Sequence, residues 1–359
     1  MELYRVWLSN SAETVVGYRP AMCPIRRRWL LSAGLAAVPI AEIFAQDRAM
    51  PIDTFASTTV LDEIWQDVAR ERGVPVRVRW PSPRTPVPPG GRPVVLFSHG
   101  LGGTRAGGEL WGRAWQAAGL VVLHLQHPGS DLEAVRRVAR SFGDQHGLRQ
   151  AAGPDQLLAR LGDVKFVLDN IARRQATEVG RWTEVRPNAV GLSGHSFGAH
   201  TTLGMAGQRY PSLDGVQEPR LAAFVAFSPT LPVQDDATRA YLRITRPMLC
   251  ITGTRDDDVA GVGATNERRT GVFAALPAGL KAHLVLEDAD HMTFAGQTGR
   301  AADVFPRHAS SRALQAQHHE VVAAVTTDWW RAHLMGDEAA ADRLRRPSGL
   351  AAGDLWQQG

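Results

Sequence analysis

The chain has 359 residues, which is enough for one large domain or two small ones. Hydrophobic residues make up 44% of the chain and charged residues 21%, so a sizeable hydrophobic core can form. The formal net charge is +4, and the body of the chain contains no dense tract of Lys and Arg. Composition therefore argues against a nucleic-acid-binding protein.

The two cysteines, Cys23 and Cys250, are too few for the ligand spacings of a zinc site. Cys250 sits in the apolar run RPMLCITG, which predicts a buried strand. Cys23 precedes the apolar segment of the N-terminal region. We expect two unpaired thiols, no structural disulfide and no bound metal.

The N-terminal region has the layout of an export signal. In residues 25–46, three arginines precede an apolar stretch that ends in a small residue, Ala45. The pair Arg26-Arg27 resembles the start of a twin-arginine signal. A glycine and a proline interrupt the apolar stretch, which is too short for a membrane span. An N-terminal helix with a basic end is the alternative interpretation.

These features predict a leader over residues 1–45, followed by a linker at 46–58. We expect export of the mature chain to the periplasm or the extracellular space, with no membrane span in the mature protein. Residues 1–21 are unusual ahead of a signal, so the true start is either Met1 or Met22.

The body of the chain begins with two predicted strands within residues 59–81, separated by a turn at Gly73. The Pro- and Gly-rich segment 81–93 is expected to be a loop. Apolar runs and amphipathic segments then alternate, which is typical of buried strands and covering helices. The predicted strands are 94–100, 120–129, 188–193, 221–229, 246–253 and 282–291, and the predicted helices are 107–118, 155–174, one that starts at Phe197, and 312–334.

Strands that alternate with helices indicate an α/β fold with a mostly parallel central sheet and helices on both faces. We expect this domain to span residues 59–335, with a C-terminal tail at 336–359. Ligand sites in such sheets lie beyond the carboxyl ends of the strands. The segment 130–155, between one strand and its helix, is expected either to border the substrate entrance or to be a surface excursion.

A serine lies between two glycines in Gly194-His195-Ser196-Phe197-Gly198, directly after a predicted strand and at the start of a helix. This G-x-S-x-G pattern in that context predicts a nucleophile elbow. In such an elbow, a strained turn exposes the serine hydroxyl, and the glycines leave room for the neighbouring strand and helix. A simple packing turn is the alternative. We predict that Ser196 is a nucleophile.

A serine hydroxyl must lose its proton as it attacks, so the site needs a base. His291 follows the last predicted strand, 95 residues after Ser196, in a loop that can reach back over the sheet. His291 is therefore the predicted base. The other candidates are weaker: His195 and His200 are fixed to the elbow, His124 and His127 come too early, His99 is expected to support a loop, His308 lies in a polar Arg-rich stretch, and His318 and His319 fall within a helix and are expected to face solvent.

The acid that orients the histidine is expected after the strand 246–253, where GTRDDD offers three carboxylates. Asp256 has the usual offset from the strand, and Asp257 is the runner-up. Asp288 and Asp290 are further alternatives, although a residue next to the histidine is poorly placed to orient it. A bound cation is also conceivable, but three adjacent aspartates alone are weak evidence for one.

A tetrahedral intermediate needs hydrogen-bond donors for its oxyanion, and the loss of one donor costs roughly 3–4 kcal/mol in comparable sites. One expected donor is the backbone N–H of Phe197, the residue after the serine. The other is expected from the Gly-rich loop 99–108, where the Leu101 N–H is the best candidate. That loop lacks the G-x-x-x-x-G-K-[ST] order of a phosphate-binding loop.

Four motifs resemble the α/β-hydrolase superfamily: FSHGLGG at 97–103, GHSFGAH at 194–200, GTRDD at 253–257 and ADHMTF at 289–294. HGLG and GHSFG together resemble one secreted branch of it more narrowly. That branch groups platelet-activating-factor acetylhydrolase-like esterases with predicted dienelactone hydrolases. The resemblance covers about residues 58–335 and implies an α/β-hydrolase fold.

The resemblance also implies roles for five residues: Ser196 as nucleophile, His291 as base, Asp256 as acid, and the Leu101 and Phe197 N–H groups as oxyanion donors. It implies no cofactor. Dienelactone hydrolases proper use a cysteine nucleophile, whereas this chain has Ser196, which favours ordinary carboxylic esters over lactones.

The leading interpretation is a secreted serine hydrolase that cleaves carboxylic esters through an acyl-enzyme intermediate. Its substrate would be a small-molecule, lipid or polymer ester, with no nucleic-acid partner. An acyltransferase or thioesterase on the same triad is one alternative, and a non-catalytic binding protein on the same fold is another. Acyl-chain length, alcohol group and oligomeric state are not determined by the sequence.

Overall fold

The computed structural model describes residues 59–139, 144–211, 213, 215–232, 237–259, 261, 263–303 and 305–359. The predicted leader at 1–45 and the predicted linker at 46–58 lie outside the described residues, and so does Cys23.

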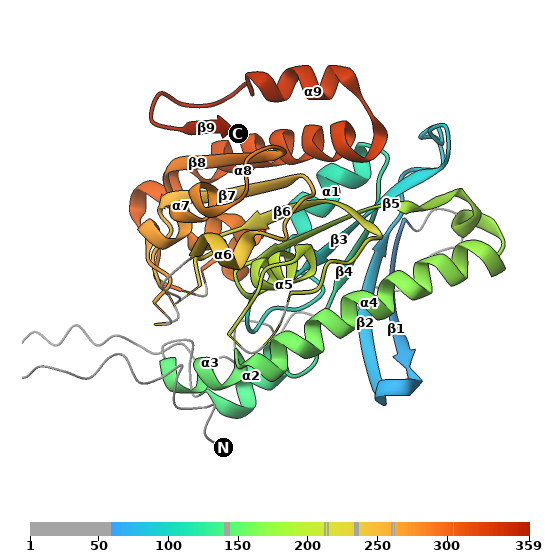
Figure 1. Ribbon diagram of the computed structural model, residues 1–359, viewed down its shortest axis with the longest axis horizontal. Coiled ribbons are helices and arrows are strands. Elements are labelled where there is room, and N and C mark those ends of the chain that lie inside the picture. Colours follow the sequence, from blue (N-terminus) through green and yellow to red (C-terminus); the bar gives the residue numbers. More distant parts are fainter. Residues whose placement is uncertain are drawn as a thin grey trace, which may run out of the picture. The chain divides into compact units, whose positions relative to one another are not determined.

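Nine strands within the described residues form one sheet, in the order β1-β2-β4-β3-β5-β6-β7-β8-β9 (Figure 1). The six central strands, from β4 to β8 in this order, pair in parallel, whereas β1, β2 and β9 pair antiparallel at the two edges. The mostly parallel sheet is thus confirmed. The strands are β1 (Val60–Asp67), β2 (Arg72–Arg79), β3 (Arg92–Ser98), β4 (Val121–Leu125), β5 (Val185–His195), β6 (Leu221–Phe227), β7 (Met248–Arg255), β8 (Lys281–Asp290) and β9 (Leu355–Gln358).

Helices cover both faces of the sheet, and β3 shows why. Its residues Val94 and Leu96 pack into the apolar cluster on one face, and Val95 and Phe97 pack into the cluster on the other. Burial on both sides explains the unbroken apolar run of this strand. The described helices are α1 (Glu109–Ala117), α2 (Leu132–Val138), α3 (Gln145–Ala151), α4 (Pro154–Thr177), α5 (Phe197–Ala206), α6 (Ala237–Tyr241), α7 (Asn266–Ala275), α8 (Ala309–Trp330) and α9 (Glu338–Arg345).

Helices α4, α5 and α7 bury their apolar residues in the first cluster, and α1 and α8 bury theirs in the second. The packing of α8 is close: a side chain at Gly191 in β5 would collide with the ring of the buried Trp330. Cys250 is buried in β7 as an unpaired thiol, as expected. None of the described helices is both long and apolar enough to cross a membrane.

The carboxyl ends of the parallel strands are aligned, which gathers their following loops at one edge. In the register of the sheet, Ser98 of β3 lies opposite Gly194 of β5, and His195 lies opposite Phe227 of β6. The predicted nucleophile, base and acid all follow strands that end at this edge.

The turn of the first hairpin differs from the expectation. Gly73 was predicted as the turn, but it lies inside β2 and pairs with Gln66. The reversal occurs earlier, at a short 3-10 helix in which the Arg70 N–H donates to the Asp67 side chain. Glu71 then adopts a left-handed conformation with φ of 49°. The cap at Asp67 stabilises this turn without a glycine.

The sequence did not predict α6 and α7, which follow β6 and β7, nor the elements in two further segments. The excursion 130–155 holds the short helices α2 and α3, which share a small apolar cluster packed against Leu101. The segment 336–359, expected as a tail, holds α9 and the edge strand β9, which pairs with β8. The prediction that His318 faces solvent is wrong, because its side chain is buried where α8 packs on the sheet.

Candidate active site

Ser196 occupies a strained turn between β5 and α5. Its backbone has φ of 56° and ψ of −114°, a conformation that costs free energy for a residue with a side chain. The Ser196 N–H donates to the Phe227 carbonyl at 3.0 Å, and the Ala199 N–H donates to the Ser196 carbonyl at 2.8 Å. These bonds from the neighbouring strand and from the first turn of α5 hold the strained residue in place.

The two flanking glycines are required by close backbone contacts. A Cβ atom at Gly194 would collide with the carbonyl oxygen of Gly198, and one at Gly198 would collide with the carbonyl oxygen of Ser98. The second contact brings the elbow against the end of β3, where the Gly-rich loop begins. The geometry is that of a nucleophile elbow.

His291 and Asp256 are brought together although they are 35 residues apart. The two atoms His291 Nδ1 and Asp256 Oδ1 lie 2.7 Å apart, and both side chains are buried. Because an ionised carboxylate can only accept a hydrogen bond, the Nδ1–H group of His291 donates one to Asp256. The other ring nitrogen, Nε2, then has a lone pair that can accept a proton. This is the arrangement that a base needs in order to act on a serine hydroxyl.

The alternative acids have other partners. Asp257 is largely exposed and lies 3.5 Å from His308, and Asp288 pairs with Arg255. Asp290 caps the turn that begins at His291, and it also pairs with Arg307 at 2.8 Å. Among these carboxylates, only Asp256 contacts the histidine ring.

A buried arginine contacts Asp256 on the same carboxylate oxygen as His291. Arg269 Nε lies 3.0 Å from Asp256 Oδ1 and also donates to the Asp256 carbonyl at 2.9 Å. Thr252 Oγ1 donates to the second carboxylate oxygen at 2.8 Å. Burial alone raises the pKa of Asp256, but the charge of Arg269 and the hydrogen bond with His291 outweigh it and hold that pKa well below its usual value. Asp256 therefore stays ionised.

His195, which the sequence analysis set aside, holds the His291 backbone. Its Nε2 donates to the His291 carbonyl at 2.9 Å, and the two rings have centroids 4.6 Å apart. Burial and the nearby His291 lower the pKa of His195 well below its usual value, so this ring is neutral. The position of His195 at the end of β5 was the one feature of the sequence that could have suggested this contact with His291.

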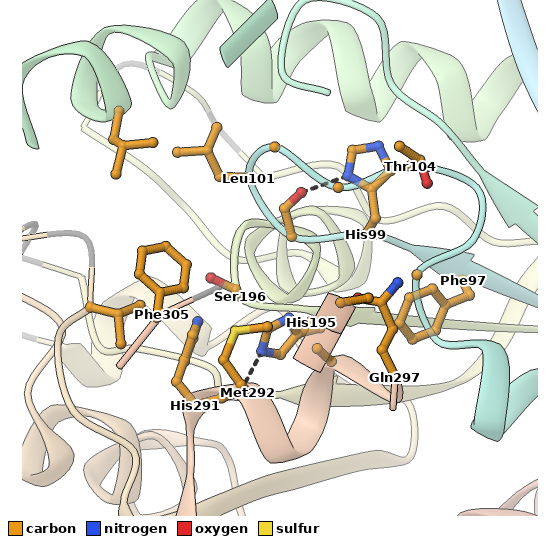
Figure 2. Close-up of a pocket in the computed structure, with 18 residues that line it drawn as sticks. Phe97, His99, Leu101, Thr104, His195, Ser196, His291, Met292, Gln297 and Phe305 are labelled. Atoms are coloured by element: carbon orange, nitrogen blue, oxygen red, sulfur yellow. Dashed lines mark hydrogen bonds between the residues drawn. The ribbon is translucent and has the colours of Figure 1, made fainter. Parts of the chain in front are cut away.

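Ser196, His195 and His291 line one cavity together with the loop at 99–108, and Figure 2 shows the serine hydroxyl and the His291 ring facing this space. The cavity has about 820 Å³ of empty space, counting the part that is open to solvent. Leu148 of α3 also lines it, so the excursion 130–155 borders the cavity. The remaining wall is largely apolar and includes Leu101, Val259, Met292, Ala295, Ala301 and Phe305.

Two backbone N–H groups are available near the serine. Phe197 is the first residue of α5, so its N–H has no partner within the helix. Leu101 lies in a loop that is anchored by the next residue: the Gly102 N–H donates to the Ser130 carbonyl at 3.0 Å. In the part of the chain that the structure describes, no hydrogen bond from the Leu101 N–H is found. Of the two predicted oxyanion donors, Leu101 lines the cavity, and Phe197 directly follows Ser196, which lines it too.

A second serine–histidine–aspartate chain lies beneath this loop. His127 Nε2 is 2.9 Å from Ser98 Oγ, and His127 Nδ1 is 2.9 Å from Asp163 Oδ2. All three side chains are fully buried, so no substrate can reach Ser98. The Asp163 carboxylate also accepts from Arg72, and these partners lower the pKa of Asp163 to about 2 against the effect of burial. These three hydrogen-bonded side chains help to hold the end of β3, where the loop at 99–108 begins.

The described residues contain no group of three or more His, Cys, Asp or Glu side chains arranged to hold a metal ion. Asp258, the third of the adjacent aspartates, accepts from the Gly263 N–H at 2.6 Å. The three carboxylates at 256–258 therefore have separate surroundings rather than a common centre.

No family model and no curated protein matches the chain. Among solved structures, it is similar to a ferulic acid esterase from Streptomyces cinnamoneus, with a TM-score of 0.55 and 19% sequence identity. The match covers 83% of this chain and 95% of that one. The likeness, with the sheet order and the elbow, shows that the chain has the α/β-hydrolase fold. In all, 617 solved chains match, and so widespread a fold does not by itself define a substrate.

The contact between Asp256 and His291 predicts a large effect of one substitution. If the site is catalytic, Asp256→Asn should lower kcat about 10³- to 10⁴-fold, because the amide no longer holds the imidazole in the tautomer that accepts the serine proton. Asp257→Asn is the matched control and should change kcat less than about twofold. Steady-state kinetics on an active ester checks this, and equal losses in the two variants would contradict the assignment.

The state of His195 predicts the pH dependence. Since burial lowers the pKa of His195 well below its usual value, His195 stays neutral and only one histidine ionisation should control the acid limb of kcat/KM, although two imidazole rings lie 4.6 Å apart. A plot of log kcat/KM against pH should fall with a limiting slope of one. Circular dichroism at each pH controls for unfolding. A slope of two would mean that both rings titrate together.

Proposed function

We propose that this protein is a serine hydrolase that cleaves neutral carboxylic esters. One observation carries the proposal: His291, oriented by the buried carboxylate of Asp256, and the strained Ser196 line the same cavity as a loop with available N–H groups. The similarity to a ferulic acid esterase concerns a protein with 19% identity and supports the fold only. The esterase assignment therefore depends on the residues of the site.

In the proposed first step, the Ser196 oxygen attacks the ester carbonyl carbon, and its proton passes to His291 Nε2. The carbonyl electron pair moves onto oxygen, where the Leu101 and Phe197 N–H groups stabilise the charge. The carbon–oxygen bond to the alcohol then breaks, and the leaving alkoxide takes the proton from His291. An acyl group remains on Ser196.

In the second step, water attacks the acyl carbon while His291 takes one of its protons. The intermediate collapses, the bond to Ser196 breaks, and the serine oxygen receives that proton. Asp256 stays ionised throughout and stabilises the imidazolium that forms in each step. Its low pKa, set by Arg269 and His291, suits this role.

The lining of the cavity supports a neutral substrate. None of its described residues is Asp, Glu, Lys or Arg, and Thr104 and Gln297 are uncharged polar groups on one wall. A carboxylate that entered this space would lose hydration without gaining a cationic partner, which costs several kcal/mol. The proposal therefore favours an uncharged acyl group and an uncharged alcohol group.

The branch with platelet-activating-factor acetylhydrolase-like esterases is part of the proposal and is supported by the motifs HGLG and GHSFG. Export by a twin-arginine signal is likewise proposed from the pattern in residues 25–46. An exported esterase would meet its ester outside the cytoplasm.

The experiment compares p-nitrophenyl pentanoate with the analogue of the same chain length that ends in a carboxylate. We expect turnover of the neutral ester and a kcat/KM at least about tenfold lower for the charged one, because each 1.4 kcal/mol of unpaired desolvation is a factor of ten. Ser196→Ala is the control and should reduce both rates to background. An absence of turnover on neutral esters of every chain length would sink the esterase proposal, and equal rates for both analogues would sink the neutral-substrate part.

A further inference from the structure

Arg160 is a fully buried cation whose hydrogen bonds of 3.3 Å or less all go to neutral oxygens. It lies on α4, and its side chain has no solvent exposure. Nη1 donates to the His99 carbonyl at 2.7 Å, and Nε donates to Ser130 Oγ at 2.8 Å. Nη2 donates to the Gly100 carbonyl at 3.3 Å. Nearby Asp163 acts on it only through its charge. Burying a cation among carbonyl groups is costly, so the arrangement calls for a reason.

The Gly100 carbonyl belongs to the same peptide unit as the Leu101 N–H. A trans peptide is planar, with its C=O and N–H pointing in opposite directions. A donor that fixes the direction of the Gly100 carbonyl therefore fixes the direction of the Leu101 N–H as well. A charged donor also polarises the peptide and makes its N–H a stronger donor at the other end.

The same carbonyl has two further donors: the Gly103 N–H, at 3.1 Å, and the His99 ring. His99 Nε2 accepts from the His127 backbone N–H at 3.0 Å, so the ring proton is on Nδ1. That Nδ1 lies 2.5 Å from the Gly100 oxygen and donates to it, and the dashed line at His99 in Figure 2 marks this bond. Three donors, from Arg160, His99 and the Gly103 N–H, thus converge on the Gly100 carbonyl, and the Leu101 N–H of that planar peptide points away from the carbonyl oxygen.

The same guanidinium contacts the residue that supplies the other N–H. The Arg160 Cζ atom lies 4.3 Å from the centroid of the Phe197 ring, within the range of a cation–π interaction. Ser130, which Arg160 holds through Nε, accepts the Gly102 N–H that anchors the loop. Arg160 therefore joins the elbow, the loop at 99–103 and α4 in one rigid unit.

We propose that Arg160 is a positioning residue that orients and polarises the Leu101 N–H for the oxyanion. The inference rests on the proposed esterase function, since only an acyl-transfer reaction creates that oxyanion. Arg160 itself touches no substrate, because its contacts are with backbone carbonyls, serine hydroxyls and the rings of His99 and Phe197. Its effect should appear in the transition state and not in ground-state binding.

The experiment compares Arg160→Met with Arg174→Met. Arg174 is a matched control on the same helix: it pairs with Glu63 at 2.9 Å and lies over the rings of Trp65 and Trp182, far along α4 from the loop. We expect kcat to fall about 10- to 100-fold in Arg160→Met with KM changed less than about threefold, and kcat to stay within about twofold in Arg174→Met.

A trifluoromethyl ketone provides the specific readout. Ser196 adds to its carbonyl carbon, the serine proton passes to His291, and the carbonyl oxygen becomes an anion that needs the same N–H groups. Its affinity should fall in Arg160→Met by the same factor as kcat/KM, as expected for a transition-state analogue. Equal losses of ketone affinity in both arginine variants, or none in Arg160→Met, would overturn the proposal.

Two further measurements cover the failure of a variant or of the function. If Arg160→Met does not fold, Ser130→Ala removes one hydrogen bond from Arg160 and should lower kcat and ketone affinity together by severalfold. If the wild type proves inactive on all esters, the esterase proposal fails separately. The positioning role of Arg160 is then tested by NMR, through the chemical shift of the Leu101 amide proton. Its resonance should move upfield in the Arg160 variant, or in Ser130→Ala if that is the one that folds. An unmoved resonance would overturn the positioning role.

Discussion

The site depends on one close contact, that of the elbow against the end of β3. Gly198 approaches the Ser98 carbonyl so closely that no side chain fits between them. Because Ser98 is followed directly by the loop at 99–103, this contact sets the distance between the serine and the N–H groups of that loop. The strain at Ser196 is the cost, and hydrogen bonds from β6 and α5 offset it.

Two buried arginines support the two halves of the proposed reaction. Arg269 keeps the Asp256 carboxylate ionised, which in turn orients His291. Arg160 holds the backbone carbonyls behind the Leu101 N–H. Neither arginine is proposed to contact the substrate. Arg269 acts through Asp256 on the His291 ring, and Arg160 acts through the Gly100 carbonyl on the Leu101 N–H. The buried chain from Ser98 through His127 to Asp163 resembles a triad but has no access to substrate, so exposure and not geometry alone distinguishes the two sets.

Local patterns were sufficient for much of the fold, because strands such as β3 are buried on both faces and read as unbroken apolar runs. The sequence could not choose between Asp256 and Asp257, since the choice depends on Arg269, which lies 13 residues further on. It missed α2 and α3, which are short helices with a small shared cluster, and β9, an edge strand whose residues are mostly exposed. The contacts of Arg160 could not be predicted from the sequence for the same reason as those of Arg269, because they are made with residues about 60 positions away in the chain.

The most direct test of the account asks which atom carries the acyl group. The protein would be mixed with a p-nitrophenyl ester, quenched in acid within milliseconds, digested and examined by mass spectrometry. The account predicts that the peptide containing Ser196 gains the mass of the acyl group, and that fragmentation assigns it to the serine oxygen. Turnover accompanied by acylation of another residue, or turnover with no acyl-enzyme under conditions that show a burst of p-nitrophenol, would contradict it.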